Sequence, residues 1–159
     1  MKPRHLIVPF AVASVFAIAA CHQKPQVDPA IEAAIKTRHD GFKQIGGAMK
    51  KIGDTLKSGG SLNPELTEAA HTMNQEAVKI KDWFPAGSGP ESGLKTGAKP
   101  EIWEKPDEFA QKRDALVTEV GKLTAAADAG DAAGFAEQVP AVGQACKSCH
   151  EEFRNKDEH

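Results

Sequence analysis

The chain has 159 residues, 40% of them hydrophobic, with 20 Lys and Arg against 22 Asp and Glu and only three cysteines. A chain of this length fits one ordinary domain after a removable leader. Its basic residues are not clustered, which excludes the positive patch expected of a nucleic-acid-binding protein. It also has no recognisable nucleophile–base pair, so the sequence does not indicate an enzyme.

Residues 1–20 have the pattern of a secretory signal peptide. Lys2 and Arg4 make a basic start, an apolar stretch follows over Leu6–Ala17, and small residues precede Cys21. The apolar stretch is too short for a membrane-spanning helix. We therefore expect export and removal of the leader.

The end of this leader, Ile18-Ala19-Ala20-Cys21, resembles the lipobox of bacterial lipoproteins, although Ile18 stands where leucine is commoner. The resemblance implies that Cys21 becomes lipid-modified after cleavage and that residues 21–29 tether a domain over residues 30–159 to a membrane. Ordinary cleavage after Ala20, which gives a soluble periplasmic protein, is the alternative. An exposed free thiol is a liability in an oxidising compartment, which favours the lipid anchor.

Two amphipathic helices are predicted in the first half of the domain. Over Pro29–Lys57, apolar residues recur three, four and seven positions apart and form one stripe: Ile31, Ile35, Phe42, Ile45, Met49, Ile52 and Leu56. Gly59-Gly60 ends this helix, and Asn63 caps a second one that begins at Pro64. The apolar stripe of the second helix runs as far as Phe84.

A long connection and two more helices complete the domain. The Gly-, Pro- and Ser-rich stretch Pro85–Pro100 reads as a crossover loop, unusually long for a compact bundle. A third helix is predicted over Pro106–Ala127, and a last one from Asp131 onward, kinked by Pro140. Because strand signals are absent, the fold class predicted is all-α, an antiparallel four-helix bundle.

The last helix carries the run Cys146-Lys147-Ser148-Cys149-His150. Two thiols at this spacing can each bond to a vinyl group of one haem, and the adjacent imidazole can then bind iron. Viewed down a helix, His150 lies about 40° to one side of Cys146 and Cys149 about 60° to the other. All three side chains therefore project from one face, and the sequence predicts a single covalent haem c with His150 as metal ligand.

Three other readings of these residues are weaker. A redox dithiol normally accompanies a βαβ pattern, which does not precede Cys146. A zinc site would need more Cys or His ligands nearby, and the remaining cysteine, Cys21, is at the far end of the chain. A structural disulfide would leave His150 unexplained.

Three segments together resemble the class II c-type cytochromes, the cytochrome c′ type and its low-spin sister branch. They are Ala145–Arg154 at the end, Ala98–Trp103 after the crossover and Ile35–Arg38 in the first helix. The resemblance spans about residues 31–156 and agrees with the predicted bundle, since cytochrome c′ is a standard example of that fold.

The resemblance assigns roles to two arginines. Arg38 lies on the apolar stripe, where an unpartnered charge is costly, and in the family the matching Arg pairs with a haem propionate. Its alternative is a side chain whose stem snorkels to water. Arg154 matches a basic residue beside the proximal histidine, although a charge that favours the helix C-terminus is nearly as good an explanation.

What faces the other side of the iron decides the chemistry. Matching the first helix to the family through Arg38 puts Phe42 at this distal position, where low-spin members carry methionine. A phenyl ring cannot ligate iron, so five-coordinate, high-spin iron is expected. The alternative is a six-coordinate electron-transfer cytochrome with Met49 or His39 as sixth ligand, although core packing suits Met49 better and solvent or a propionate suits His39 better.

These expectations define a binding or electron-transfer protein rather than an enzyme. An apolar pocket under Phe42 would bind nitric oxide or a similar diatomic gas, as family members of this kind are thought to do, and the haem would pass electrons to redox partner proteins. We expect it on the periplasmic side of a bacterial membrane, because c-type haem attachment takes place there. Relatives often form homodimers, a possibility that the sequence leaves open.

Overall fold

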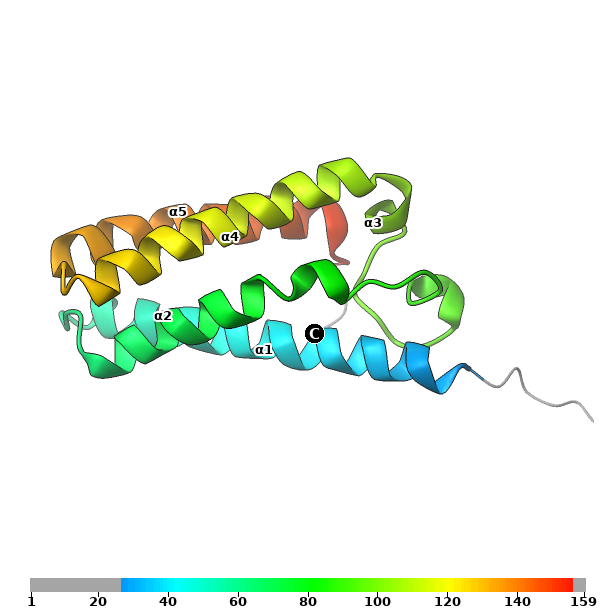
Figure 1. Cartoon of the computed structure of the whole chain (residues 1–159), viewed down its shortest axis with the longest axis horizontal. Coiled ribbons are helices and arrows are strands. Elements are labelled where there is room, and N and C mark those ends of the chain that lie inside the picture. Colours follow the sequence, from blue (N-terminus) through cyan, green and yellow to red (C-terminus); the bar gives the residue numbers. More distant parts are fainter. Residues whose placement is uncertain (1–26, 156–159) are drawn as a thin grey trace, which may run out of the picture.

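The computed structural model describes residues 27–155, and within this range it is a bundle of four long helices (Figure 1). These are α1 (Pro29–Lys57), α2 (Pro64–Ala77), α4 (Pro106–Asp128) and α5 (Ala132–Phe153). The helix pair α1 and α2 lies beside the pair α4 and α5 (Figure 1). The predicted signal peptide, Cys21 and most of the predicted tether lie outside the described residues.

Side-chain caps explain where three of the long helices begin. The Asp28 carboxylate accepts from the amide of Ala30 at 2.8 Å, and the Asn63 side chain accepts from the amide of Leu66 at 3.1 Å. Asp131 does the same for Gly134 at 2.9 Å. Such caps satisfy amides that have no partner inside a helix. The predicted starts at Pro29 and Pro64 are confirmed, and the last helix begins at Ala132, one residue after the predicted start at Asp131, which is its cap.

The second helix is shorter than the apolar period predicted. It ends at Ala77, and a 3₁₀ turn, η1, follows over Ile80–Asp82. The side chains of Ile80 and Trp83 are still buried, so the apolar stripe continues although the α-helical hydrogen bonds do not. Periodicity reports which side chains turn inward, and it does not distinguish an α-helix from a tighter turn.

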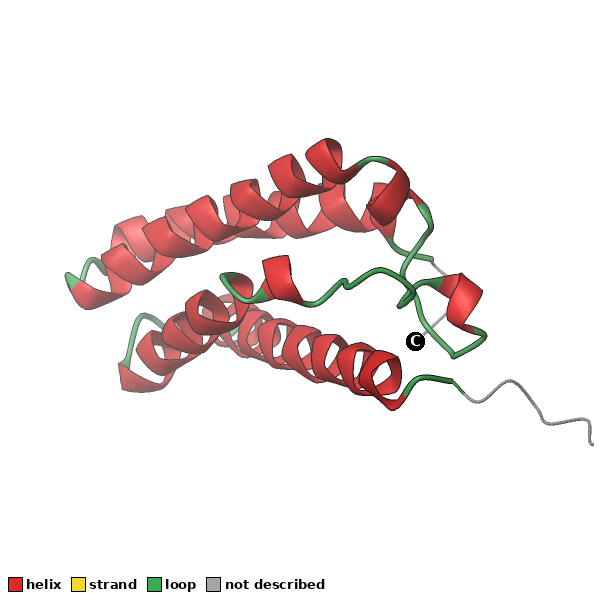
Figure 2. Cartoon of the chain, turned by 45° about the vertical axis from the view of Figure 1, so that its right-hand side comes forward, coloured by secondary structure: helices red, strands yellow, loops and turns green. Residues whose placement is uncertain are grey.

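The crossover contains short helical pieces that the sequence analysis did not predict. A 3₁₀ turn, η2, covers Pro90–Ser92, and the short helix α3 covers Glu101–Glu104. The rest of the connection is loop, and it runs across one end of the bundle from η1 to α3 (Figure 2).

The core runs along the inside of the bundle and leaves few polar groups buried. Thr124 is one of them, and its hydroxyl donates to the carbonyl oxygens of Val120 at 2.9 Å and Ala70 at 3.3 Å. The largest fully buried apolar side chains come from all four long helices: Ile52, Leu66, Met73, Val120, Leu123, Phe135 and Val142.

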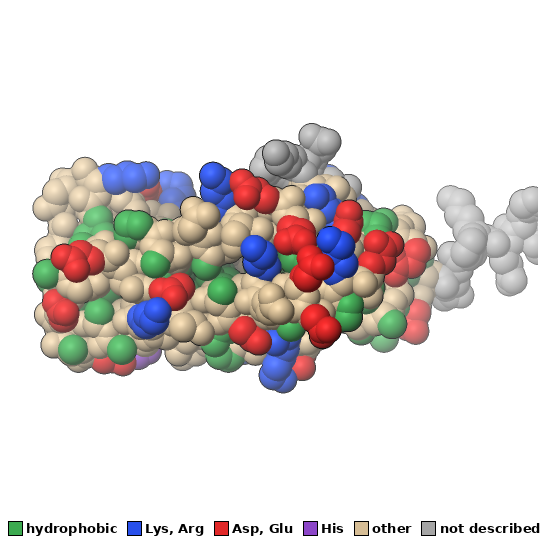
Figure 3. All heavy atoms as spheres, turned by 90° about the horizontal axis from the view of Figure 1, so that it is seen from above, with side chains coloured by type: hydrophobic (Ala, Val, Ile, Leu, Met, Phe, Trp, Pro, Cys, Tyr) green, Lys and Arg blue, Asp and Glu red, His purple; other side chains and the backbone are tan. Residues whose placement is uncertain are grey.

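Acidic and basic side chains are interspersed on the face that Figure 3 shows. Among residues 27–155, no helix combines the length and the apolar character that crossing a bilayer requires.

Candidate haem site

The end of α5 carries both cysteines and the histidine. Cys146 and Cys149 are half-buried and pack against the hydrophobic core, whereas His150 is exposed at the surface of the last turn. Both thiols are free. Two thiols that face the core beside an imidazole fit a planar apolar group that is bonded to the helix and has one edge near solvent.

The surroundings of the thiols disfavour the redox-dithiol reading. Burial raises the pKa of the Cys146 thiol. The pKa of Cys149 is raised to about 11, chiefly by burial and next by the nearby Cys146, against a small opposing effect of Lys112. A dithiol that exchanges with disulfides needs a thiolate at neutral pH, and these sites favour the neutral thiol.

The surroundings of His150 favour the neutral imidazole over the imidazolium. Partial burial of the ring lowers its pKa, and the positive charge of Arg154, one turn further on, lowers it again. A neutral imidazole has a lone pair free to coordinate, so Arg154 supports the ligand by disfavouring the imidazolium. The role that the resemblance implies for Arg154 beside a haem ligand stays a prediction.

A chain of aromatic rings connects α1 with the end of α5. The Phe42 ring lies 5.0 Å from that of Trp83 and 6.3 Å from that of Phe84. The contacts continue from Phe84 to Phe109 at 5.0 Å and from Phe109 to Phe153 at 5.3 Å. Phe153 is three residues after His150, so Phe42 lies at the same end of the bundle as the haem-attachment motif.

Trp83 fits against α1 at a glycine. A Cβ atom on Gly41 would lie 2.2 Å from the edge of the buried Trp83 indole. The absence of a side chain at Gly41 therefore allows the indole to lie against the helix backbone beside Phe42.

Arg38 is buried, with 4% of its surface exposed, and holds the crossover loop. Its guanidinium donates to the Ser88 hydroxyl at 2.9 Å, the Ser88 carbonyl oxygen at 2.6 Å and the Thr96 hydroxyl at 2.5 Å. It also lies 5.1 Å from the centre of the Phe84 ring. Burial lowers its pKa, and the negative charge of Glu91 opposes that shift. The group therefore does not snorkel to water, and the interaction predicted with a propionate stays a prediction.

The two candidate sixth ligands differ in their surroundings. The side chain of His39 is 74% exposed, and its Nδ1 lies 3.6 Å from an Asp40 carboxylate oxygen. Met49 packs against the core, and its terminal methyl would lie 3.6 Å from a Cβ atom built on Gly143 of α5. Met49 is therefore an inward-facing residue and His39 an outward-facing one.

The residues that would hold a haem lie on one helix. Within residues 27–155, no three side chains of His, Cys, Asp or Glu come together as a metal site would require. Cys146, Cys149 and His150 are the residues that would hold a haem, all from α5.

These features define a c-type haem protein built on an antiparallel helical bundle, and comparison with known proteins identifies the family. The family described as cytochrome C′ matches residues 33–154. The chain therefore belongs to the cytochrome c′ family, whose members are periplasmic and carry one covalently attached haem c.

Individual relatives agree with this assignment. Cytochrome c-554 of Cereibacter sphaeroides is 34% identical over 149 residues, which cover 92% of this chain and 97% of that protein. Cytochrome c′ of Pararhodospirillum photometricum is 33% identical over 77% of this chain and 97% of its own.

Solved structures show the same fold. Cytochrome c′ from Thermochromatium tepidum matches with a TM-score of 0.73 at 28% identity, over 80% of this chain and 98% of that one. A nitric oxide complex of a mutant cytochrome c prime from Alcaligenes xylosoxidans matches with a TM-score of 0.70 at 26% identity, over 79% and 97% of the two chains.

Sequence reasoning missed the residues that fasten the crossover loop. Ser88 and Thr96 carry no spacing signal, because they lie in a stretch of irregular backbone. Lys99 was part of a motif used for the resemblance but received no role. Gly41 lies within a regular helical pattern, and only the position of Trp83 reveals why a side chain would not fit there.

Proposed function

We propose that this protein is a periplasmic haem protein with five-coordinate iron that captures nitric oxide under a lid formed by Phe42. A haem held by one axial imidazole supplies an iron site open to small ligands. The observation that carries the proposal is the ring chain from Phe42 to Phe153, which supports a place for the phenyl ring at the haem end of the bundle.

Phe42 would control which gases bind. Its ring is packed against Trp83 and Phe84, so a ligand that enters must displace it. Overpacking of this kind costs about 1–3 kcal/mol, which weakens every distal ligand by roughly one to two decades. Nitric oxide binds ferrous haem strongly enough to bear that loss. Oxygen would also lack a hydrogen-bond donor on a phenyl lid.

Two solved structures with this fold support a gas ligand. They are nitric oxide complexes of mutant and variant forms of cytochrome c prime from Alcaligenes xylosoxidans. Those ligands belong to that protein, and the proposal extends the chemistry to this chain on the family match.

The test places a ligating atom at the proposed lid. In Phe42→Met, a thioether replaces the phenyl ring, and we expect the reduced protein to become six-coordinate and low-spin with sharp, split visible bands. Ile45→Met is the matched control, because Ile45 is another buried core position on α1. A high-spin spectrum for Phe42→Met, with haem content unchanged, would remove Phe42 from the distal position.

A second candidate is an electron carrier with Met49 as sixth ligand. It is favoured by the orientation of Met49, whose side chain points inward to Gly143 of α5. Gly143 lies three residues before Cys146. The visible spectrum of the unmodified protein distinguishes the two candidates, since only the electron carrier is low-spin before any substitution. His39, being exposed, is the weaker ligand.

The remaining parts of the proposal concern partners. We propose that the protein acts by binding and electron transfer rather than catalysis, that Cys21 carries a lipid anchor and that redox partners meet the exposed edge near His150. Two copies would associate through α1 and α2, the arrangement that the family resemblance often implies.

A further inference from the structure

The helix that carries His150 ends without a left-handed residue at its C-terminus. The last four carbonyl groups of an α-helix lack partners inside the helix. Many helices end with a left-handed residue, whose turn brings backbone N–H groups to these carbonyls. Here the residue after α5, Arg154, is extended, with φ −121° and ψ 133°. Its amide donates to the His150 carbonyl oxygen at 3.1 Å, which leaves three carbonyls to be satisfied from elsewhere.

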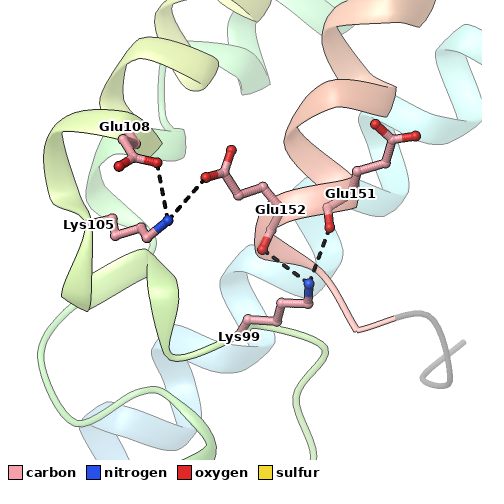
Figure 4. Close-up of polar contacts among 5 residues, drawn as sticks. All are labelled: Lys99, Lys105, Glu108, Glu151 and Glu152. Carbon is pink, nitrogen blue, oxygen red and sulfur yellow. Dashed lines mark hydrogen bonds and ion pairs between the residues drawn. The ribbon is translucent and has the colours of Figure 1, made fainter.

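Lys99, in the crossover, donates hydrogen bonds to all three of these carbonyls. Its Nζ lies 3.2 Å from the carbonyl oxygens of both Glu151 and Glu152 (Figure 4). Its backbone amide donates to the Phe153 carbonyl oxygen at 3.0 Å. A cation here also complements the negative end of the helix dipole.

The residues just before Lys99 are themselves held in place. Ala98 pairs with Arg154 in an isolated antiparallel bridge, and the Asn155 amide donates to the Gly97 carbonyl oxygen at 2.8 Å. The Ala98 amide donates at 3.1 Å to the Thr96 hydroxyl, which also accepts from Arg38 of α1. The contact is therefore a built connection between the crossover and the last turn of α5.

We propose that Lys99 is a positioning residue for His150. Bonds from Cys146 and Cys149 to a haem would tether the turn on the amino-terminal side of His150. On the carboxyl-terminal side, α5 offers the Arg154 amide and an exposed ion pair between Lys147 and Glu151 at 3.7 Å, and the carbonyl oxygens of the last three residues have no partner within the helix. Helix ends fray, so a free last turn would let the imidazole change its angle to the iron. Lys99 closes that side by binding the carbonyls of the three residues that follow His150.

The inference rests on the haem ligation by His150 in the proposed function, and its test separates the two. In Lys99→Met, the stem remains and the ammonium is lost. We expect amide hydrogen exchange in residues 150–155 to accelerate by about fivefold, as for loss of a charged group at a helix end. In the reduced haem protein, the iron–histidine stretching band in resonance Raman spectra should shift and broaden.

Three control variants show whether the effect of Lys99→Met comes from the loss of its ammonium group. Lys99→Arg retains a cation with donors and should restore both readouts. Lys105→Met removes a neighbouring ammonium that reaches the Glu152 and Glu108 carboxylates but no α5 carbonyl (Figure 4), so the band should not move. Lys95→Met removes a charge from the same loop, and within residues 27–155 its ammonium makes no hydrogen bond or ion pair. If Lys99→Met does not fold, Lys99→Gln, with a shorter neutral donor, is measured in its place.

The two measurements separate a capping role of Lys99 from a positioning role. Unchanged exchange in Lys99→Met would show that the ammonium does not close the helix end. Faster exchange with an unchanged iron–histidine band would make Lys99 a structural cap only, and the positioning role would be wrong. Exchange can be read whatever the coordination of the iron, so a six-coordinate haem in the unmodified protein would contradict the proposed function and leave the Lys99 cap intact.

Discussion

At the residue scale, two side chains of α1 lie one turn apart and have different surroundings. Arg38 is directed to the crossover loop, and Phe42 is packed among aromatic rings. One is a buried charge satisfied by neutral oxygens, and the other is an apolar group in a cluster. Each leads to a prediction with a separate readout.

Phe42→Ala should raise the affinity of the reduced protein for carbon monoxide by about 10- to 100-fold, because the cost of displacing the ring is removed. A carbon monoxide titration followed by absorbance measures this. Ile52→Val is the control, since it truncates a fully buried side chain of the same helix away from the aromatic chain. An affinity equal to that of the unmodified protein would mean that Phe42 does not cover the iron.

Arg38→Met should lower the free energy of unfolding by about 2–3 kcal/mol, because the oxygens of Ser88 and Thr96 lose charged donors in a buried place. Denaturant unfolding measures the loss. Arg113→Met is the comparison: Arg113 pairs with the adjacent Asp114 near the surface, and its loss should cost no more than about 1 kcal/mol. Equal losses in the two variants would show that the loop does not depend on Arg38.

At the element scale, the glycines of α1 are not equivalent. Gly41 is covered by the Trp83 indole, whereas a Cβ atom on Gly46 would have no other atom within 4 Å. Glycine inside an exposed helix is destabilising relative to alanine, so the same substitution should have opposite signs at these two positions.

Gly41→Ala should destabilise the protein by about 1–3 kcal/mol, because the buried Trp83 ring cannot move aside without disturbing Phe42. Gly46→Ala should stabilise it by about 0.5–1 kcal/mol. Thermal unfolding of both variants under one set of conditions measures the difference. A stabilising effect at Gly41 would mean that the indole does not occupy this place.

At the scale of the whole molecule, a lipid anchor at Cys21 would determine where the bundle works. Cys21→Ser should release the protein from the membrane fraction into the soluble periplasmic fraction, because a serine cannot take the lipid. Fractionation with immunodetection of the protein measures this, and Cys146→Ser, which retains Cys21, is a control that should stay with the membrane. Release of the unmodified protein would favour ordinary cleavage after Ala20.

The bundle could be predicted from the sequence because its signals are local. The cap at Asn63, the proline at Pro64 and the apolar period of α1 each depend on residues a few positions apart, and the structure confirms the elements that they predicted. The haem motif is local too, since Cys146, Cys149 and His150 occupy a single turn and a half of helix.

The connections across the bundle could not be predicted in this way. Arg38 meets Ser88 from 50 positions away, and no composition or spacing reports which loop oxygen will face a buried guanidinium. The indole of Trp83 likewise explains Gly41 only once the two elements are together. What was missed therefore consists of long-range contacts made by residues in irregular backbone.

The contact between Lys99 and the end of α5 has a consequence for how the protein matures. The ammonium and its carbonyl partners are separated by 52 and 53 positions, so this contact needs distant parts of the chain to meet and belongs to the slower events of folding. We expect a newly exported chain to present its two thiols on a loosely ordered helix end, accessible to the machinery that attaches the cofactor. Closure of the crossover over that end would then lock the finished product.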